Sequence, residues 1–289
     1  MQVTLTWGVA AAVLFGALLH ASWNALVKSS TDKALDTALI HLLGSAIGVP
    51  LLLVAGPPPA AAWPFIGASL VIHIGYYTAL TGAYRHGDLG LTYPLMRGTG
   101  PMLVALASAS VVGEHLSALA WAGVVGVCCG VLLLGLSRHA LEQPRAVAFA
   151  LANAVVIGLY TVVDALGARH AVQAGGSALQ YVALLFTFDG WPFALIVLAR
   201  RGPAAAWPYA RRRAPIAVVG AAASLGSYGI ALWAMTRAPV AMVAALRETS
   251  VLFAALLGTW LLKEAFTLRR AAGTVAILAG VLALRLGSA

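Results

Sequence analysis

Charged side chains are scarce in this sequence. Asp, Glu, Lys and Arg together make up 9% of its 289 residues, whereas hydrophobic residues make up 61%, and the mean hydropathy is +0.91. Soluble domains carry about 25% charged residues. This scarcity excludes a large soluble core and predicts an integral membrane protein.

Acidic residues and cysteines are scarcer still. The net charge of +9 could suggest nucleic acid, but the basic residues lie in short gaps between apolar stretches and form no basic face, so we expect no nucleic-acid partner. The two cysteines, Cys128 and Cys129, are adjacent inside an apolar stretch, which favours packing over a disulfide or a metal site.

Motifs for catalysis are absent from the sequence. The seven histidines show no metal-ligand spacing, and there is no nucleophile elbow and no Walker or Rossmann glycine pattern. We therefore expect neither an enzyme nor a bound cofactor or metal. Residues 1–3 lack the basic start of a signal peptide, so the first apolar stretch is expected to remain in the protein.

Long apolar stretches are what the sequence does contain. About 20 residues of helix cross the hydrocarbon core of a bilayer. Windows of this length predict an all-α protein with ten transmembrane helices and no soluble domain. The predicted spans are 4–27, 34–55, 63–84, 89–112, 117–137, 146–168, 177–199, 213–236, 239–262 and 268–286.

The second half of the chain repeats the first. Between 114–136 and 264–286, a shift of 150 positions gives nine identical residues. The same shift matches Arg97 with Arg247, Thr99 with Thr249, Glu114 with Glu264, Gly123 with Gly273 and Gly130 with Gly280. The chain therefore divides into residues 1–140 and 141–289, with five spans each. An odd number of spans inverts the second repeat, as in secondary transporters with a central cavity.

The basic residues of the loops predict the orientation. If both termini are outside, thirteen Lys and Arg residues lie in inner connectors and three in outer ones. This bias places both termini on the non-cytoplasmic face, the periplasm of a bacterial inner membrane.

Polar residues inside the spans follow helical stripes. Such stripes on spans three, four, eight and nine are expected to line one cavity, with spans one and six beside them. For any one tyrosine, hydrogen bonding between helices is an equally good interpretation, and for His41 it is the better one. The expected substrate-binding residues are Asn24, His73, Tyr77, Tyr93, Arg97, Thr99, Tyr160, Ser224, Tyr228, Arg247, Glu248 and Thr249.

The two arginines inside spans carry the strongest signal. An arginine at the centre of a membrane helix costs about 3 kcal/mol on insertion scales, so two at equivalent positions indicate a function. Arg97, expected in the cytoplasmic half, could bind a substrate carboxylate. The alternative is an arginine locked to Glu248, Asp164 or backbone carbonyls, where it would hold helices together. Arg247 is expected in the outer half.

Prolines and carboxylates refine this hypothesis. Pro94 and Pro101 bracket Arg97 and predict an interrupted helix there, whereas the ninth span has no interior proline near its arginine. Glu248 and Asp189 could each carry a proton, but Gly190 and Pro192 favour a solvated, structural Asp189. Glu114 and Glu264 are expected to cap the next helix.

These features together resemble a known family. Ten spans in two repeats, Trp23-Asn24, a proline-containing fourth span ending in Gly113-Glu114, and Lys263-Glu264 before a Gly-rich last span are similar to the EamA type of the drug/metabolite transporter superfamily. The resemblance covers almost the whole chain and implies a ten-helix basket with a central cavity. It also implies export of amino acids or other small metabolites, with bacterial amino-acid exporters as the nearest match. Family members often have cytoplasmic termini, unlike the orientation expected here.

Three functions remain open from the sequence. The first is export of small metabolites, most of all amino acids, by alternating access, with the small molecule and the lipid bilayer as the partners. The second is efflux of organic cations, which requires a dominant buried carboxylate in the cavity. The third is a structural or regulatory membrane subunit without flux.

Overall fold

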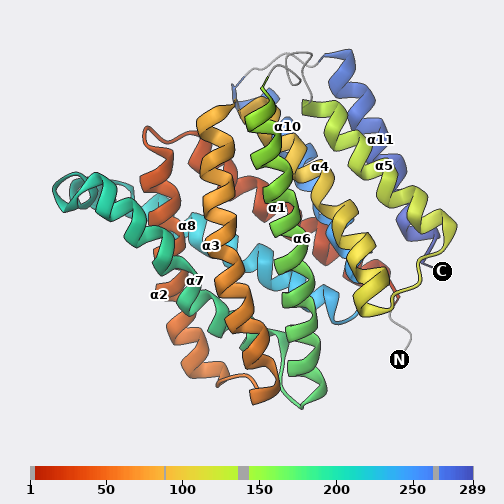
Figure 1. The fold of residues 1–289 in the computed structure, drawn as a ribbon, viewed down its shortest axis with the longest axis horizontal. Coiled ribbons are helices and arrows are strands. Elements are labelled where there is room, and N and C mark those ends of the chain that lie inside the picture. The colour runs from red at the N-terminus through yellow and green to blue at the C-terminus, as the bar shows by residue number, and fades with distance from the viewer. Residues whose placement is uncertain (1–3, 88, 136–142, 263–266, 289) are drawn as a thin grey trace.

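The computed structural model describes residues 4–87, 89–135, 143–262 and 267–288, and in these ranges the chain is helical without a strand. Figure 1 shows the helices packed as one bundle. Eleven α-helices are described: α1 (Trp7–Lys28), α2 (Lys33–Ala55), α3 (Trp63–His86), α4 (Leu89–Ala107), α5 (Ala118–Gly135), α6 (Pro144–Gln173), α7 (Ala178–Arg201), α8 (Pro203–Met235), α9 (Val240–Arg247), α10 (Thr249–Leu262) and α11 (Leu268–Leu286). A short 3₁₀ turn, η1 (Ala60–Ala62), precedes α3, and a π-turn, η2 (Ser108–Val112), extends α4.

Within the described ranges, seven helices are long and apolar enough to cross a membrane. They are Trp7–Lys28, Lys33–Ala55, Ala60–His86, Leu91–Val112, Pro144–Gln173, Ala178–Arg201 and Pro203–Met235, and Ala118–Leu134 is a shorter apolar helix. This confirms an all-helical protein with several membrane-spanning helices. The count of ten spans stays a prediction.

The ends of several helices follow from their capping residues. The Asp32 carboxylate accepts the N–H groups of Ala34 and Leu35 and so starts α2. Ser177 and Gln180 form a reciprocal capping box that starts α7.

The helix interruption lies in the opposite repeat from the one expected. α4 runs without a break through Pro94 and Pro101, so the expected interruption beside Arg97 is wrong. Instead, α9 ends at Arg247 and α10 begins at Thr249. The Glu248 N–H bonds the Ala245 carbonyl three residues back, which tightens this turn, and the Thr249 hydroxyl donates to the Leu246 carbonyl at 2.8 Å. A proline removes only one backbone donor, so it weakens a helix without having to end it.

α8 begins earlier than the predicted span. Its 33 residues include 203–212, which we expected to form a connector. This first part is anchored to α2, because Arg213 pairs with the buried Asp36 at 2.9 Å and the Tyr209 hydroxyl donates to the same carboxylate at 3.1 Å. The helix therefore continues where the polar sequence suggested a loop.

α5 and α11 lie side by side at one end of the bundle (Figure 1) and pack through glycines. A Cβ atom on Gly123 would lie 2.8 Å from the Gly280 carbonyl oxygen, and one on Gly130 would lie 2.8 Å from the Gly273 carbonyl oxygen. The helices are therefore antiparallel and nearly in backbone contact. Small residues permit such close packing in membrane helices.

The Gly280→Ala variant should loosen this helix pair. Its new methyl group would lie 2.7 Å from the Val127 nitrogen, which is closer than real Cβ contacts allow. Overpacking of this kind costs about 1–3 kcal/mol, so we expect a lower melting temperature for the purified protein in detergent. Gly67→Ala is the matched control, because nothing lies within 4 Å of a Cβ atom there. Equal losses in both variants would contradict tight packing at Gly280.

The two ends of the chain lie together. The Ser288 hydroxyl is 3.4 Å from the Leu5 carbonyl oxygen, and the Arg285 guanidinium lies 4.6 Å from the centre of the Trp7 ring. Figure 1 likewise shows N and C at the same end of the bundle. Both termini therefore lie on one face of the protein, as an even number of crossings requires; which side of the membrane this is stays a prediction.

Candidate functional site

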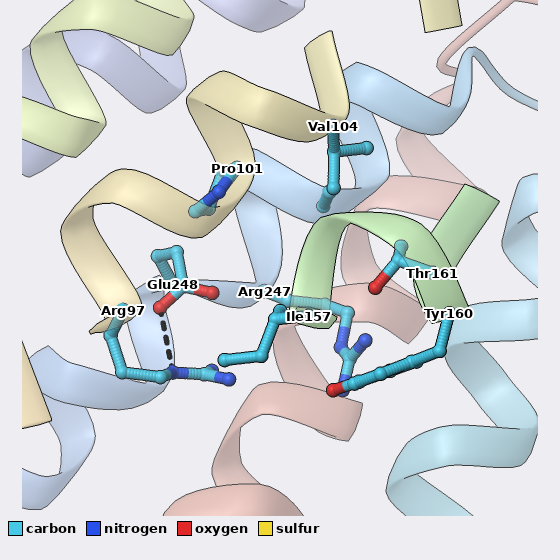
Figure 2. Close-up of a pocket in the computed structure, with 9 residues that line it drawn as sticks. Arg97, Pro101, Val104, Ile157, Tyr160, Thr161, Arg247 and Glu248 are labelled. Carbon is cyan, nitrogen blue, oxygen red and sulfur yellow. Dashed lines mark ion pairs between the residues drawn. The ribbon is translucent and has the colours of Figure 1, made fainter. Parts of the chain in front are cut away.

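Both intramembrane arginines line the same cavity. Figure 2 shows Arg97 from α4, Tyr160 from α6 and Arg247 from α9 converging on it. The rest of the lining is Pro101, Val104, Ile157, Thr161, Ala244 and Glu248. The cavity measures about 10 Å³, which is space for about one water molecule. The arginines were expected in separate halves of the pathway, but the fold brings them together at one small site.

Arg97 forms an ion pair with Glu248. Its Nε lies 3.0 Å from Glu248 Oε2 (Figure 2). Its Nη2 donates to the Ser250 hydroxyl at 3.3 Å. Both partners are largely buried. The 3.0 Å contact is an ion pair without hydrogen-bond geometry, so Nε and Oε2 each lack a hydrogen-bond partner. Of the two interpretations of Arg97, the locked ion pair describes this conformation, and its hydrogen-bonding capacity is only partly used.

Arg247 is held differently. Its guanidinium lies 5.4 Å from the centre of the Tyr228 ring, and it forms no ion pair with a carboxylate in the described part of the chain. A cation over an aromatic ring is stabilised by about 0.5–2 kcal/mol. Two arginines and one glutamate therefore leave the cavity with one excess positive charge.

Asp164 organises the aromatic wall behind Arg247. It is fully buried and accepts hydrogen bonds from the hydroxyls of Tyr181, at 2.8 Å, and Tyr228. Tyr228 is thereby fixed with its ring facing Arg247. Asp164 was considered only as a partner for Arg97. Its pairing with Tyr181 and Tyr228, 17 and 64 residues away, could not be predicted from spacing along one helix.

Some predicted site residues lie near the cavity without lining it. The Tyr228 ring centre is 6.4 Å from that of Tyr160, and the His73 ring stacks on Tyr160 with ring centres 4.6 Å apart. Thr249 follows Glu248 directly, and its hydroxyl donates to the Leu246 carbonyl. Tyr93 is partly buried against the main hydrophobic core.

Other predicted site residues lie outside the cavity lining. The Asn24 side chain donates to the His20 carbonyl of its own helix at 2.8 Å. Tyr77 stacks on Phe193 with ring centres 4.8 Å apart. Thr99 and Ser224 are half-buried and outside the cavity lining. The third and eighth spans, α3 and α8, therefore contribute no residue to the described cavity lining. α6 lines the cavity instead, through Ile157, Tyr160 and Thr161.

Glu114 caps a helix of the opposite half. Its carboxylate accepts the Val240 N–H at 2.9 Å, at the start of α9, and pairs with Arg169 at 2.6 Å. Arg169 also donates to the carbonyls of Met235 and Ala238. The expectation that Glu114 caps the next helix, α5, is therefore wrong. Glu264, its partner in the repeat, and Lys263 lie outside the described residues.

Comparisons with known proteins place the chain in a family. The model of the EamA-like transporter family matches residues 144–286. A solved crystal structure aligns with 96% of this chain and with 98% of the chain in that structure. Its TM-score of 0.70 at 22% sequence identity shows a shared fold. No curated protein matches the sequence significantly. With its helical membrane fold and this match, the chain belongs to the EamA-like transporter family of the drug/metabolite transporter superfamily.

Proposed function

We propose that this transporter exports small zwitterionic metabolites, most of all amino acids, across a bacterial inner membrane. The proposed mechanism is alternating access between two inverted five-helix repeats, residues 1–140 and 141–289. The proposed orientation has both termini in the periplasm.

The charge arrangement of the cavity carries this proposal. Arg247 has no carboxylate partner among the described residues, and the facing Glu248 Oε2 has no hydrogen-bond donor. A free amino acid supplies one carboxylate and one ammonium group. The carboxylate would pair with the Arg247 guanidinium, and the ammonium would donate to Glu248, so the ligand satisfies both groups at once.

The same arrangement disfavours organic cations. Efflux of such compounds requires a free carboxylate in the cavity, but Glu248, the carboxylate among the described lining residues, is already paired with Arg97 at 3.0 Å. A cation would also enter a cavity whose net charge is positive, where like charges repel.

The glycine contacts support the inverted repeat. Gly123 faces Gly280, and Gly130 faces Gly273. The repeat matches Gly123 with Gly273 and Gly130 with Gly280, so replacing each glycine by its equivalent turns the first contact into the second. Such an exchange is expected for a two-fold axis that relates antiparallel helices. The region matched by the family, residues 144–286, also lies within the proposed second repeat.

The break between α9 and α10 supports a conformational step. A cavity of about 10 Å³ is too small for an amino acid, so the site must open for binding and release. Glu248 lies in the turn that joins the two helices. A small rotation at this turn would move Glu248 away from Arg97 and open the cavity.

Exchange across liposomes tests the proposed function. Purified protein is reconstituted, the liposomes are loaded with unlabelled amino acids, and uptake of a labelled amino acid is followed. We expect competition by amino acids and none by the matching amines that lack the carboxylate, with protein-free liposomes as the control. Equal competition by amines or quaternary ammonium compounds would instead identify a cation transporter. No exchange across a broad metabolite panel would favour a structural or regulatory subunit.

A further inference from the structure

A second buried polar cluster lies beside the substrate cavity. Asp189 of α7 is 8% exposed and lies between two histidines. Its Oδ2 is 3.8 Å from Nδ1 of His41 on α2, and its Oδ1 is 3.8 Å from Nδ1 of His73 on α3. We call these three residues the Asp189 cluster. The expectation of a solvated Asp189 is wrong in this conformation, because α7 continues as a helix past Pro192.

Close backbone packing builds this cluster. A Cβ atom on Gly190 would lie 2.2 Å from the His41 carbonyl oxygen, so only glycine lets α7 approach α2 here. The Ser45 hydroxyl donates to the Phe186 carbonyl at 2.7 Å and accepts the Gly190 N–H at 3.2 Å. These contacts hold Asp189 against His41.

The carboxylate of Asp189 has few partners. Its Oδ1 accepts no hydrogen bond from the described residues. His73 Nδ1 lies 2.8 Å from the Ser69 carbonyl oxygen and must carry a hydrogen to bond it, so that hydrogen is not available to Asp189. Asp164 differs, because two tyrosine hydroxyls donate to it.

No strong cation neutralises the cluster. Among the described residues, no lysine or arginine forms an ion pair with Asp189. The titratable groups on the helices packed against α7 are His41 on α2, His73 and Tyr77 on α3, Tyr160 and Asp164 on α6, and Tyr228 on α8. An ionised carboxylate buried without donors or a cation is costly. A bound proton removes this cost.

From this geometry we propose that Asp189, between His41 and His73, is the proton-binding site that couples this transporter to a proton gradient. In this conformation the carboxyl group holds the proton. When the protein opens, the proton leaves to water on one side, and the carboxylate later takes another from water on the other side. As a coupling mechanism, this inference rests on the proposed function.

The structure provides a physical connection between the two sites. Tyr160 lines the substrate cavity and stacks on His73 with ring centres 4.6 Å apart. Movement of Tyr160 when substrate enters would therefore shift His73 against Asp189. Pro192 also removes the backbone donor to the Phe188 carbonyl and weakens α7 next to Asp189. The cluster thus lies where α7 can bend most easily.

Two measurements on the full-length protein test the proposal. In liposomes, a pH gradient should drive amino-acid accumulation by the wild type, and Asp189→Asn should lose this response but retain exchange without a gradient. Asp32→Asn, at an exposed ion pair, is the matched control and should keep both activities. The coupling role would be overturned if the wild type exchanged amino acids without responding to the gradient. It would also be overturned if the Asp189→Asn variant still responded.

Infrared titration needs no substrate and separates the two proposals. In the wild type we expect the carbonyl band of a protonated buried carboxyl group, and we expect this band to be lost in Asp189→Asn and retained in Asp164→Asn. Persistence of the band in Asp189→Asn, or its absence from the wild type, rules out the proton site. If the band behaves as expected but no amino acid is exchanged, the proton site stands and the proposed substrate fails.

Discussion

Replacing Glu248 with alanine should destabilise the folded protein by about 3–5 kcal/mol, because it leaves the buried Arg97 guanidinium without its carboxylate partner. The pair is buried on both sides, with Nε and Oε2 3.0 Å apart. The measurement is the free energy of unfolding of the purified protein, followed by denaturant titration in micelles.

Two further variants identify the cause of this loss. In the double variant Arg97→Leu/Glu248→Leu, both charges are replaced by apolar groups, so most of the lost stability should return. Arg201→Ala breaks the Arg201–Asp32 pair, whose side chains are 51% and 25% exposed, and leaves the Asp32 cap of α2 in place. Exposed pairs contribute about 0–1 kcal/mol, so this control should change little. A Glu248→Ala loss no larger than the Arg201→Ala loss would argue against a desolvated pair.

Replacing Arg247 with alanine should weaken substrate binding by about 10- to 100-fold, because a hydrogen bond to a charged group contributes about 1.5–3 kcal/mol. Arg247→Lys should recover part of this loss, since an ammonium group keeps the charge but not the planar two-pronged geometry. The measurement is the half-saturating amino-acid concentration for exchange in liposomes.

Arg237→Ala is the matched control for Arg247→Ala. Arg237 also lies over an aromatic ring, 5.0 Å from the centre of Trp233, but it is exposed and outside the cavity. Its removal should leave the half-saturating concentration unchanged. If both variants bind substrate as the wild type does, Arg247 has no role in carboxylate recognition.

These results would assign different roles to two arginines that occupy equivalent positions in the repeats. Arg97 has an internal partner in Glu248, whereas the position equivalent to Glu248 in the first half is Gly98. A Cβ atom on Gly98 would lie 2.6 Å from the Leu132 side chain, so α4 packs closely on α5 there. The first half therefore has no room for a second glutamate at position 98. Arg247 is thus left without an internal carboxylate partner among the described residues, and its charge can pair with a ligand.

Much of the fold was predictable because it depends on properties that are local in the chain. A bilayer selects long apolar helices regardless of their neighbours, and the lengths of α1, α2, α3 and α7 follow from this requirement. A role for Arg97, Arg247, Glu248 and Tyr160 is also a prediction from the sequence, because a polar group inside a span is costly wherever it packs, and the structure places all four side chains around one cavity.

The tertiary structure alone decided which of these groups meet. Arg97 could pair with Glu248, Asp164, carbonyls or substrate until α4 and α9 were placed side by side. Glu114 caps α9 instead of α5, and Asp189 is buried between His41 and His73 instead of solvated. Hydropathy and helical period fix the length of a membrane helix and the direction of its polar face. They do not fix its neighbour, because that choice depends on close packing of small residues such as Gly190 and Gly280 over long sequence separations.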